Sequence, residues 1–239
     1  MSRFLLNAIF IPLLYLTQCK KQEAVSGYVP ATIITTDTAG SKRFLALGDS
    51  YTIGQSVGAY ERFPAQTVSL LRSMGIRIND PFYIAATGWT TNDLANSITN
   101  SYTEKKYDVV TLLIGVNDQY QTHDTSGYRS RFAGLLNKAI TFAQGIHEHV
   151  VVLSIPDYSV TPFAQNSDTT EIRREIDLFN AINKEVTDEQ NCKYLNITPF
   201  TREARYDNTL IASDGLHPSG KEYAVWAQPL SQIMYPFLK

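Results

Sequence analysis

The chain lacks most of the features that mark specialised classes of protein. It has only two cysteines in 239 residues, so no disulfide framework is available to hold a small domain together. Lysine and arginine number 21 against 23 aspartates and glutamates, and this near balance gives no basis for nucleic-acid binding. No internal repeat, low-complexity tract or heptad run is present, which excludes solenoids and coiled coils. The 44% of hydrophobic residues suffices for one sizeable core.

Long hydrophobic runs are also missing. The longest nearly unbroken apolar run covers residues 4–16, after a single arginine. A helix that spans a bilayer needs ~20 such residues, so this run is too short. A short positive start followed by a run of this length is typical of a secretory signal peptide. We therefore predict that residues 1–18 are a signal peptide and that the protein is exported to the cell envelope.

The end of this run carries a further signal. The sequence L-T-Q-C at residues 16–19 resembles the lipobox of bacterial lipoproteins, although Gln18 stands where a small residue is usual. The resemblance implies that Cys19 is lipidated and that residues 19–41 tether a domain of residues 42–239 to a membrane. The alternative is an ordinary signal peptide with an incidental cysteine.

Strand-like and helix-like segments alternate along the rest of the chain. The apolar runs predicted as strands are residues 44–47, 82–86, 109–114, 150–155 and 194–197. Helical periodicity predicts helices at residues 64–74, 92–98, 128–144 and 169–187 and a last one after residue 218. This alternation predicts a parallel sheet covered by helices on both faces, a three-layer α/β/α fold of the flavodoxin-like kind. For that fold class we expect the strand order 2-1-3-4-5.

Irregular stretches with polar residues or glycine follow the first three predicted strands. Ser50 follows the first strand, Gly88 the second and Asn117 the third. Because the carboxyl ends of parallel strands meet at one edge of a sheet, we expect these residues to lie close together. A fourth stretch, residues 214–219, precedes the last helix and can fold over the same edge.

These residue types suit acyl transfer. The Ser50 hydroxyl becomes a nucleophile when a base such as His217 takes its proton. Asp214, three residues before that histidine, can bond the other ring nitrogen and fix its tautomer. The backbone N–H groups of Ser50 and Gly88 and the side-chain amide of Asn117 can donate to the oxyanion of a tetrahedral intermediate.

The four stretches together resemble the conserved blocks of a known hydrolase family. They are G-D-S-Y at residues 48–51, Gly88, G-V-N-D at residues 115–118 and D-G-L-H-P at residues 214–218. In this order, over about residues 43–237, they are similar to the blocks of the SGNH (GDSL) hydrolases. Tyr51 stands where the leucine of the family's name would be. The G-x-S-x-G elbow of α/β-hydrolases is absent from the chain.

The resemblance implies a catalytic triad of Ser50, Asp214 and His217. It also implies an oxyanion hole formed by Ser50, Gly88 and Asn117, a flavodoxin-like sheet, and neither a metal nor another cofactor. The implied function is a serine esterase that forms an acyl-serine intermediate. Its substrate would be a lysophospholipid, a short acyl ester or an acetylated carbohydrate.

Two other functions are open at this point. One is a non-catalytic surface module that binds a glycan or lipid on the same fold, and the other is an acyltransferase. Aromatic residues after the strand ends, namely Tyr51, Trp89, Tyr120 and Tyr158, suit the walls of a cleft for a sugar or an acyl chain equally well.

The remaining candidate residues have simpler interpretations. Position alone places His123, after the third strand, near the predicted cleft. We interpret H-x-H at residues 147–149 as solvated surface rather than a metal site, and Cys192 as a half-buried structural cysteine. Asp49 and Asp118 are expected to hold loop backbone rather than to react.

Overall fold

The computed structural model of the chain describes residues 40–100 and 106–239. The signal peptide predicted at residues 1–18, Cys19 and nearly all of the predicted tether lie outside the described residues. Within the described ranges, no helix is both long enough and apolar enough to cross a membrane.

One five-stranded sheet, parallel throughout, forms the centre of the described part, in the order β2-β1-β3-β4-β5. Its strands are β1 (Phe44–Gly48), β2 (Phe82–Ala85), β3 (Val109–Leu113), β4 (Val150–Leu153) and β5 (Lys193–Leu195). The predicted strand order is therefore confirmed. Leu47 of β1 lies opposite Ile84 of β2 on one side and Leu112 of β3 on the other. The carboxyl ends of these three strands consequently finish side by side.

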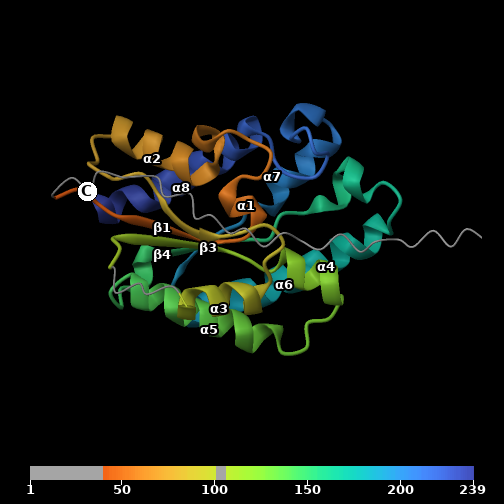
Figure 1. Cartoon of the computed structure of the whole chain (residues 1–239), viewed down its shortest axis with the longest axis horizontal. Coiled ribbons are helices and arrows are strands. Elements are labelled where there is room, and N and C mark those ends of the chain that lie inside the picture. Colours follow the sequence, from red (N-terminus) through yellow and green to blue (C-terminus); the bar gives the residue numbers. More distant parts are fainter. Residues whose placement is uncertain (1–39, 101–105) are drawn as a thin grey trace, which may run out of the picture. The chain divides into compact units, whose positions relative to one another are not determined.

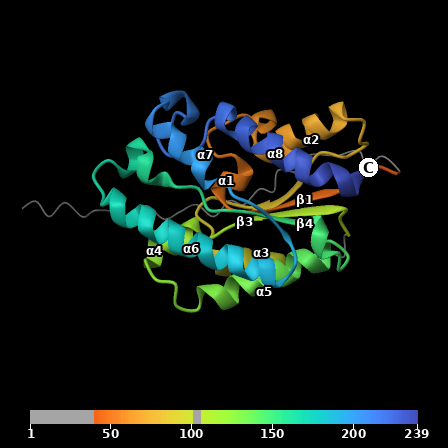
Figure 2. The ribbon, with the colours of Figure 1, turned by 180° about the vertical axis from the view of Figure 1, so that it is seen from behind.

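Helices cover both faces of the sheet (Figure 1). The longer helices are α2 (Phe63–Ser73), α3 (Thr91–Asn100), α5 (Tyr128–Phe142), α6 (Thr169–Glu189) and α8 (Gly220–Leu238). The short ones are α1 (Ser50–Ile53), α4 (Val116–Thr122) and α7 (Thr198–Arg202). Helices α2 and α8 pack together on one face, and α3, α5 and α6 lie on the other, as the reverse view in Figure 2 also shows. The predicted three-layer α/β/α fold is confirmed.

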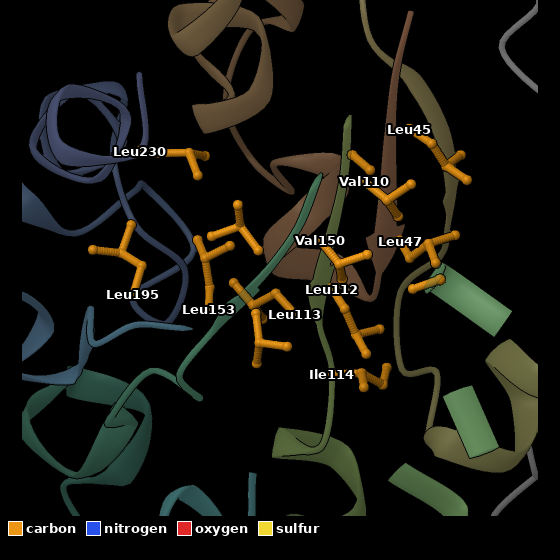
Figure 3. Packing of buried hydrophobic residues seen from close by; sticks show 14 of the residues in the cluster. Leu45, Leu47, Val110, Leu112, Leu113, Ile114, Val150, Leu153, Leu195 and Leu230 are labelled. Atoms are coloured by element: carbon orange, nitrogen blue, oxygen red, sulfur yellow. The ribbon is translucent and has the colours of Figure 1, made fainter. Parts of the chain in front are cut away.

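The sheet is apolar on both sides, as a sheet covered by two helix layers must be. Every residue of β1, β3 and β4 is buried. Figure 3 shows Leu47 and Leu112 of neighbouring strands in this core, with Leu195 and, from helix α8, Leu230 at its far side. Burial of each such side chain contributes ~1.5–3 kcal/mol to the free energy of folding. This packing holds in place the strand ends that carry the site.

The structure differs from the sequence prediction mainly in its short elements. Helices α1, α4 and α7 were not predicted, because one or two turns are too short to show helical periodicity. The fifth strand ends at Leu195 rather than continuing to residue 197. There the Ile197 N–H donates to the Ser154 Oγ at 2.8 Å instead of to a neighbouring strand.

Candidate active site

Ser50, His217 and Asp214 form a continuous hydrogen-bonded series across two distant parts of the chain. Ser50 Oγ lies 2.9 Å from His217 Nε2, and His217 Nδ1 lies 2.7 Å from Asp214 Oδ2. The first two residues are 4% and 5% exposed, whereas the carboxylate side chain is 26% exposed. The structure therefore brings together the three residues predicted as a triad, with the carboxylate on the solvent side.

The end of strand β1 places Ser50 at the sheet edge. At Gly48 an added Cβ would lie 2.3 Å from the Leu113 carbonyl oxygen, so only glycine lets β1 and β3 end this close together. The Asp49 side chain then accepts from the Tyr51 N–H at 3.0 Å and caps helix α1. Ser50 is the first residue of α1, and its N–H has no acceptor within the helix.

The loop that carries the histidine is held by its own aspartate. Asp214 Oδ1 accepts from the N–H groups of Leu216 and His217, both at 3.0 Å, in an Asx-type turn. The Ala212 N–H donates to the His217 carbonyl at 2.7 Å and closes the loop. The ring of Tyr51 packs on the imidazole with centroids 4.9 Å apart, so the ring is positioned from two sides.

The same bonds keep the aspartate ionised. Partial burial acts to raise the pKa of the Asp214 carboxyl. Hydrogen bonds to the carboxylate outweigh burial and hold this pKa below its ordinary value. They come from the Ser56 hydroxyl, from the N–H groups of His217 and Leu216, and from the imidazole. An anion beside Nδ1 favours the tautomer in which this nitrogen carries the hydrogen, which leaves Nε2 free to accept from Ser50.

Gly88 and Asn117 line one cleft together with Ser50 and His217. Gly88 has a φ of +77°, which side chains rarely adopt, and open space surrounds the point where a Cβ would be. Asn117 is on helix α4, not in a loop as predicted, and its Nδ2 donates to the Trp89 carbonyl at 3.0 Å. An amide nitrogen carries two hydrogens, so the second can serve a ligand.

A cleft of about 200 Å³ opens over these groups. It is lined by Ser50, Tyr51, Gln55, Thr87, Gly88, Val116, Asn117, Tyr120, Tyr158, Phe163, Leu216 and His217. Four of the five residues predicted as triad or oxyanion-hole members thus line one cleft. Asp214 stands behind the histidine, outside the lining.

One wall of the cleft is aromatic. The rings of Tyr120, Tyr158 and Phe163 lie 5.9–6.2 Å apart from centroid to centroid, and Tyr120 and Phe163 are about half exposed. The predictions for Tyr51, Tyr120 and Tyr158 are confirmed. No local pattern in the sequence links Phe163 to the site, so sequence reasoning misses it. Trp89 does not line the cleft; its ring packs against the core.

Other residues considered from the sequence lie away from the chemistry. His123 does not line the cleft, and its Nδ1 lies 2.8 Å from the buried Glu175 carboxylate. His147 and His149 form a 3-10 turn before β4. Cys192 is buried rather than half-buried, and burial raises the pKa of its thiol to about 11, which fits a structural cysteine. Among the described residues, no group of three or more metal-ligating side chains is close enough to hold a metal.

Asp49 and Asp118 hold backbone, as expected. Asp118 accepts from the N–H of Thr91 at 2.8 Å and from its hydroxyl at 2.6 Å, which ties helix α4 to the start of α3. Asp49 is fully buried, and its second oxygen has no partner among the described residues. Burial is the main cause that raises the pKa of the Asp49 carboxyl to about 8, and the charge of Asp118 adds to it.

A serine–imidazole–carboxylate series at the carboxyl edge of a parallel α/β/α sheet defines the class as that of the serine hydrolases. The GDSL-like Lipase/Acylhydrolase family matches residues 46–225, and the chain belongs to this family. It is therefore an ester hydrolase of the SGNH (GDSL) type. A comparison with curated protein sequences finds no match.

Solved structures share the fold at low sequence identity. An acetylxylan esterase, Axe2, from Geobacillus stearothermophilus has a TM-score of 0.62 and 21% identity, covering 82% of this chain and 95% of that one. A lipase/acylhydrolase from Enterococcus faecalis has a TM-score of 0.65 and 18% identity, covering 83% and 97%. TesA has a TM-score of 0.63 and 17% identity, covering 82% and 99%.

Proposed function

We propose that the protein hydrolyses carboxylic esters of short acyl groups through an acyl-Ser50 intermediate. The observation that carries this proposal is the series of contacts from Ser50 Oγ through the His217 imidazole to Asp214, at 2.9 and 2.7 Å, in which Ser50 and His217 line a cleft. The Ser50 hydroxyl lies beside the imidazole that can take its proton, and the imidazole lies beside the carboxylate that can stabilise its charge. Such a relay also argues against a non-catalytic binding module, which has no use for an activated hydroxyl.

Acylation begins when the ester carbonyl enters the cleft. Nε2 of His217 takes the Ser50 proton as Oγ attacks the carbonyl carbon, and the Asp214 anion stabilises the imidazolium that forms. The oxyanion of the tetrahedral intermediate accepts hydrogen bonds from the Ser50 and Gly88 N–H groups and from the second hydrogen of Asn117 Nδ2. The imidazolium then protonates the leaving alkoxide, and the acyl group remains on Oγ.

Deacylation repeats these steps with water. His217 takes a proton from a water molecule, which attacks the acyl carbon, and the same donors hold the second oxyanion. Collapse of this intermediate breaks the bond to Oγ, returns the proton to Ser50 and releases a carboxylic acid. An alcohol that replaced water here would give transfer rather than hydrolysis.

The size of the cleft supports a short acyl group. Sites for drug-sized ligands occupy ~300–1000 Å³, and this cleft has about 200 Å³. We propose that the aromatic wall of Tyr120, Tyr158 and Phe163, which lines the same cleft as Ser50, limits the length of the acyl chain. Acetyl or similarly short esters, on a sugar or another alcohol, therefore fit better than long-chain lipids.

A series of p-nitrophenyl esters from acetate to dodecanoate tests the proposal. We expect kcat/KM to be highest for the two-carbon and four-carbon esters and to fall with chain length. Ser50→Ala should lose at least ~1000-fold in kcat. Equal rates in that variant would refute the mechanism, and a preference for dodecanoate would refute the substrate class. Added alcohol acceptors, with products separated by chromatography, distinguish hydrolysis from acyl transfer.

The proposed place of action rests on the sequence. We propose that the chain is exported and anchored to a membrane through a lipid on Cys19, because a short apolar run precedes the lipobox-like L-T-Q-C. Cys19→Ala should then move the protein from the membrane fraction to the soluble fraction without loss of esterase activity. Unchanged membrane association of that variant would contradict the anchor.

A further inference from the structure

Among the described residues, the Asp214 carboxylate has one hydrogen-bond partner that lies outside its own loop. Both bonds to Oδ1 come from backbone N–H groups within three residues, and His217 Nδ1 approaches Oδ2 from the same loop. The remaining bond to Oδ2 comes from the hydroxyl of Ser56, which donates at 2.7 Å from 158 positions away in the sequence. Ser56 is therefore the residue that connects the carboxylate to the loop of the nucleophile.

The backbone at Ser56 indicates that its side chain has a purpose. Its φ is +66°, in the left-handed region that residues other than glycine, asparagine and aspartate seldom adopt. The neighbouring Gly54 has a similar φ of +63°. Glycine would satisfy the backbone at position 56 equally well, so the hydroxyl is what serine adds there.

The exposure of the carboxylate explains the need for this hydroxyl. Ser50 and His217 are almost completely buried and are held by packing, but the Asp214 side chain is 26% exposed. Two N–H groups of its own loop hold Oδ1, so Oδ2 is the oxygen for which water competes. A second donor on Oδ2 fixes the plane of the carboxylate, and with it the direction of the bond to His217 Nδ1.

We propose that Ser56 is a positioning residue of the active site, which orients Asp214 and through it the imidazole that activates Ser50. This inference rests on the triad roles proposed above. Ser56 does not line the cleft, so it acts through Asp214 and not on the substrate. Its position six residues after Ser50 ties the loop of the nucleophile to the loop of the base.

The clearest variant is Ser56→Gly, which removes the hydroxyl and keeps a backbone that tolerates the left-handed conformation. We expect kcat for p-nitrophenyl acetate to fall about tenfold, because misplaced catalytic groups slow the chemical step. KM and Tm should stay close to the wild-type values.

Ser56→Asn keeps a donor in a residue that tolerates this φ and should recover part of the loss in kcat. Asn191→Gly, at φ +54° beyond helix α6 and away from the site, is the matched control and should leave kcat unchanged.

A double-mutant cycle separates positioning from a general effect on the loop. In an Asp214→Ala background, where no carboxylate remains to be oriented, Ser56→Gly should change kcat by less than about twofold. A tenfold fall in both backgrounds, or a wild-type kcat for Ser56→Gly alone, would overturn the inference. If Ser50→Ala is inactive, either of these two outcomes refutes only the role of Ser56. If Ser50→Ala is active, the proposed triad and this inference both fail.

Discussion

Replacement of Asn117 by alanine should slow the chemistry without weakening substrate binding. One hydrogen of its Nδ2 is engaged by the Trp89 carbonyl at 3.0 Å, and this bond holds the amide beside Ser50 and Gly88 in the cleft. The other hydrogen is the proposed donor to the oxyanion. Because that oxyanion exists only in the tetrahedral intermediate and the transition states around it, its loss should lower kcat and leave KM nearly unchanged.

The expected size of the effect follows from the donors that remain. Removal of one of several oxyanion donors costs ~100- to 1000-fold in kcat, or ~2.7–4 kcal/mol. The N–H groups of Ser50 and Gly88 stay in place, so residual activity should be measurable. Loss of the bond to the Trp89 carbonyl should also reduce the free energy of unfolding by ~0.5–1.5 kcal/mol. For a domain of this size that lowers Tm by a few degrees, ~2–4 °C per kcal/mol.

The assay is the steady-state hydrolysis of p-nitrophenyl acetate, with Tm measured by circular dichroism. Asn96→Ala, a substitution of an exposed asparagine on α3, is the matched control and should keep wild-type kcat. Asn117→Asp should be slower than the alanine variant, because a carboxylate repels the developing oxyanion. A fall in kcat of less than threefold, or a loss expressed wholly in KM, would refute the role of Asn117.

Three further predictions concern the cleft, the sheet edge and pH. Phe163→Ala opens the aromatic wall. The kcat/KM for the hexanoate ester, divided by that for the acetate ester, should then rise by about tenfold. An unchanged ratio contradicts the wall as a limit on chain length. Gly48→Ala places a Cβ 2.3 Å from the Leu113 carbonyl oxygen, and we expect a loss of about 3 kcal/mol of stability, measured as a lower Tm; a wild-type Tm counts against this packing. Burial raises the folded-state pKa of Asp49 from 3.8 to about 8. The contribution of its protonated form to the free energy of unfolding is therefore fully present below about pH 4, and it is lost as the pH rises toward 8. Asp49→Asn cannot ionise, so its free energy of unfolding in urea should fall less between pH 5 and pH 9 than that of the wild type; equal falls would show that Asp49 is not the titrating group.

The central part of the fold follows from sequence patterns. Strands such as β1 and β3 are nearly continuous apolar runs, because both faces of the sheet are covered, and such runs are easily recognised. Their parallel arrangement forces Ser50, Gly88 and Asn117 to one edge. For this reason the sequence alone predicts that these residues are grouped in one cleft.

Features that depend on tertiary contacts could not be predicted in this way. Asn117 lies on helix α4, whose two turns show no periodic pattern, and its orientation is set by the distant Trp89 carbonyl. Phe163 reaches the cleft because the Gly215 carbonyl accepts from its N–H at 3.0 Å, a contact between segments far apart in the sequence. The left-handed φ of Ser56 has no signal in its residue type, since serine is common in all turns.

Covalent labelling of Ser50 tests the central claim most directly. Diethyl p-nitrophenyl phosphate should transfer its diethylphosphoryl group to Ser50 Oγ, with release of one p-nitrophenolate per protein molecule. Peptide mass spectrometry should find that group on the peptide that contains Ser50, Ser50→Ala should remain unlabelled, and His217→Ala should react much more slowly because Oγ has lost its base. Labelling at another residue, or equal labelling of Ser50→Ala, would contradict the account of Ser50 as the nucleophile of this esterase.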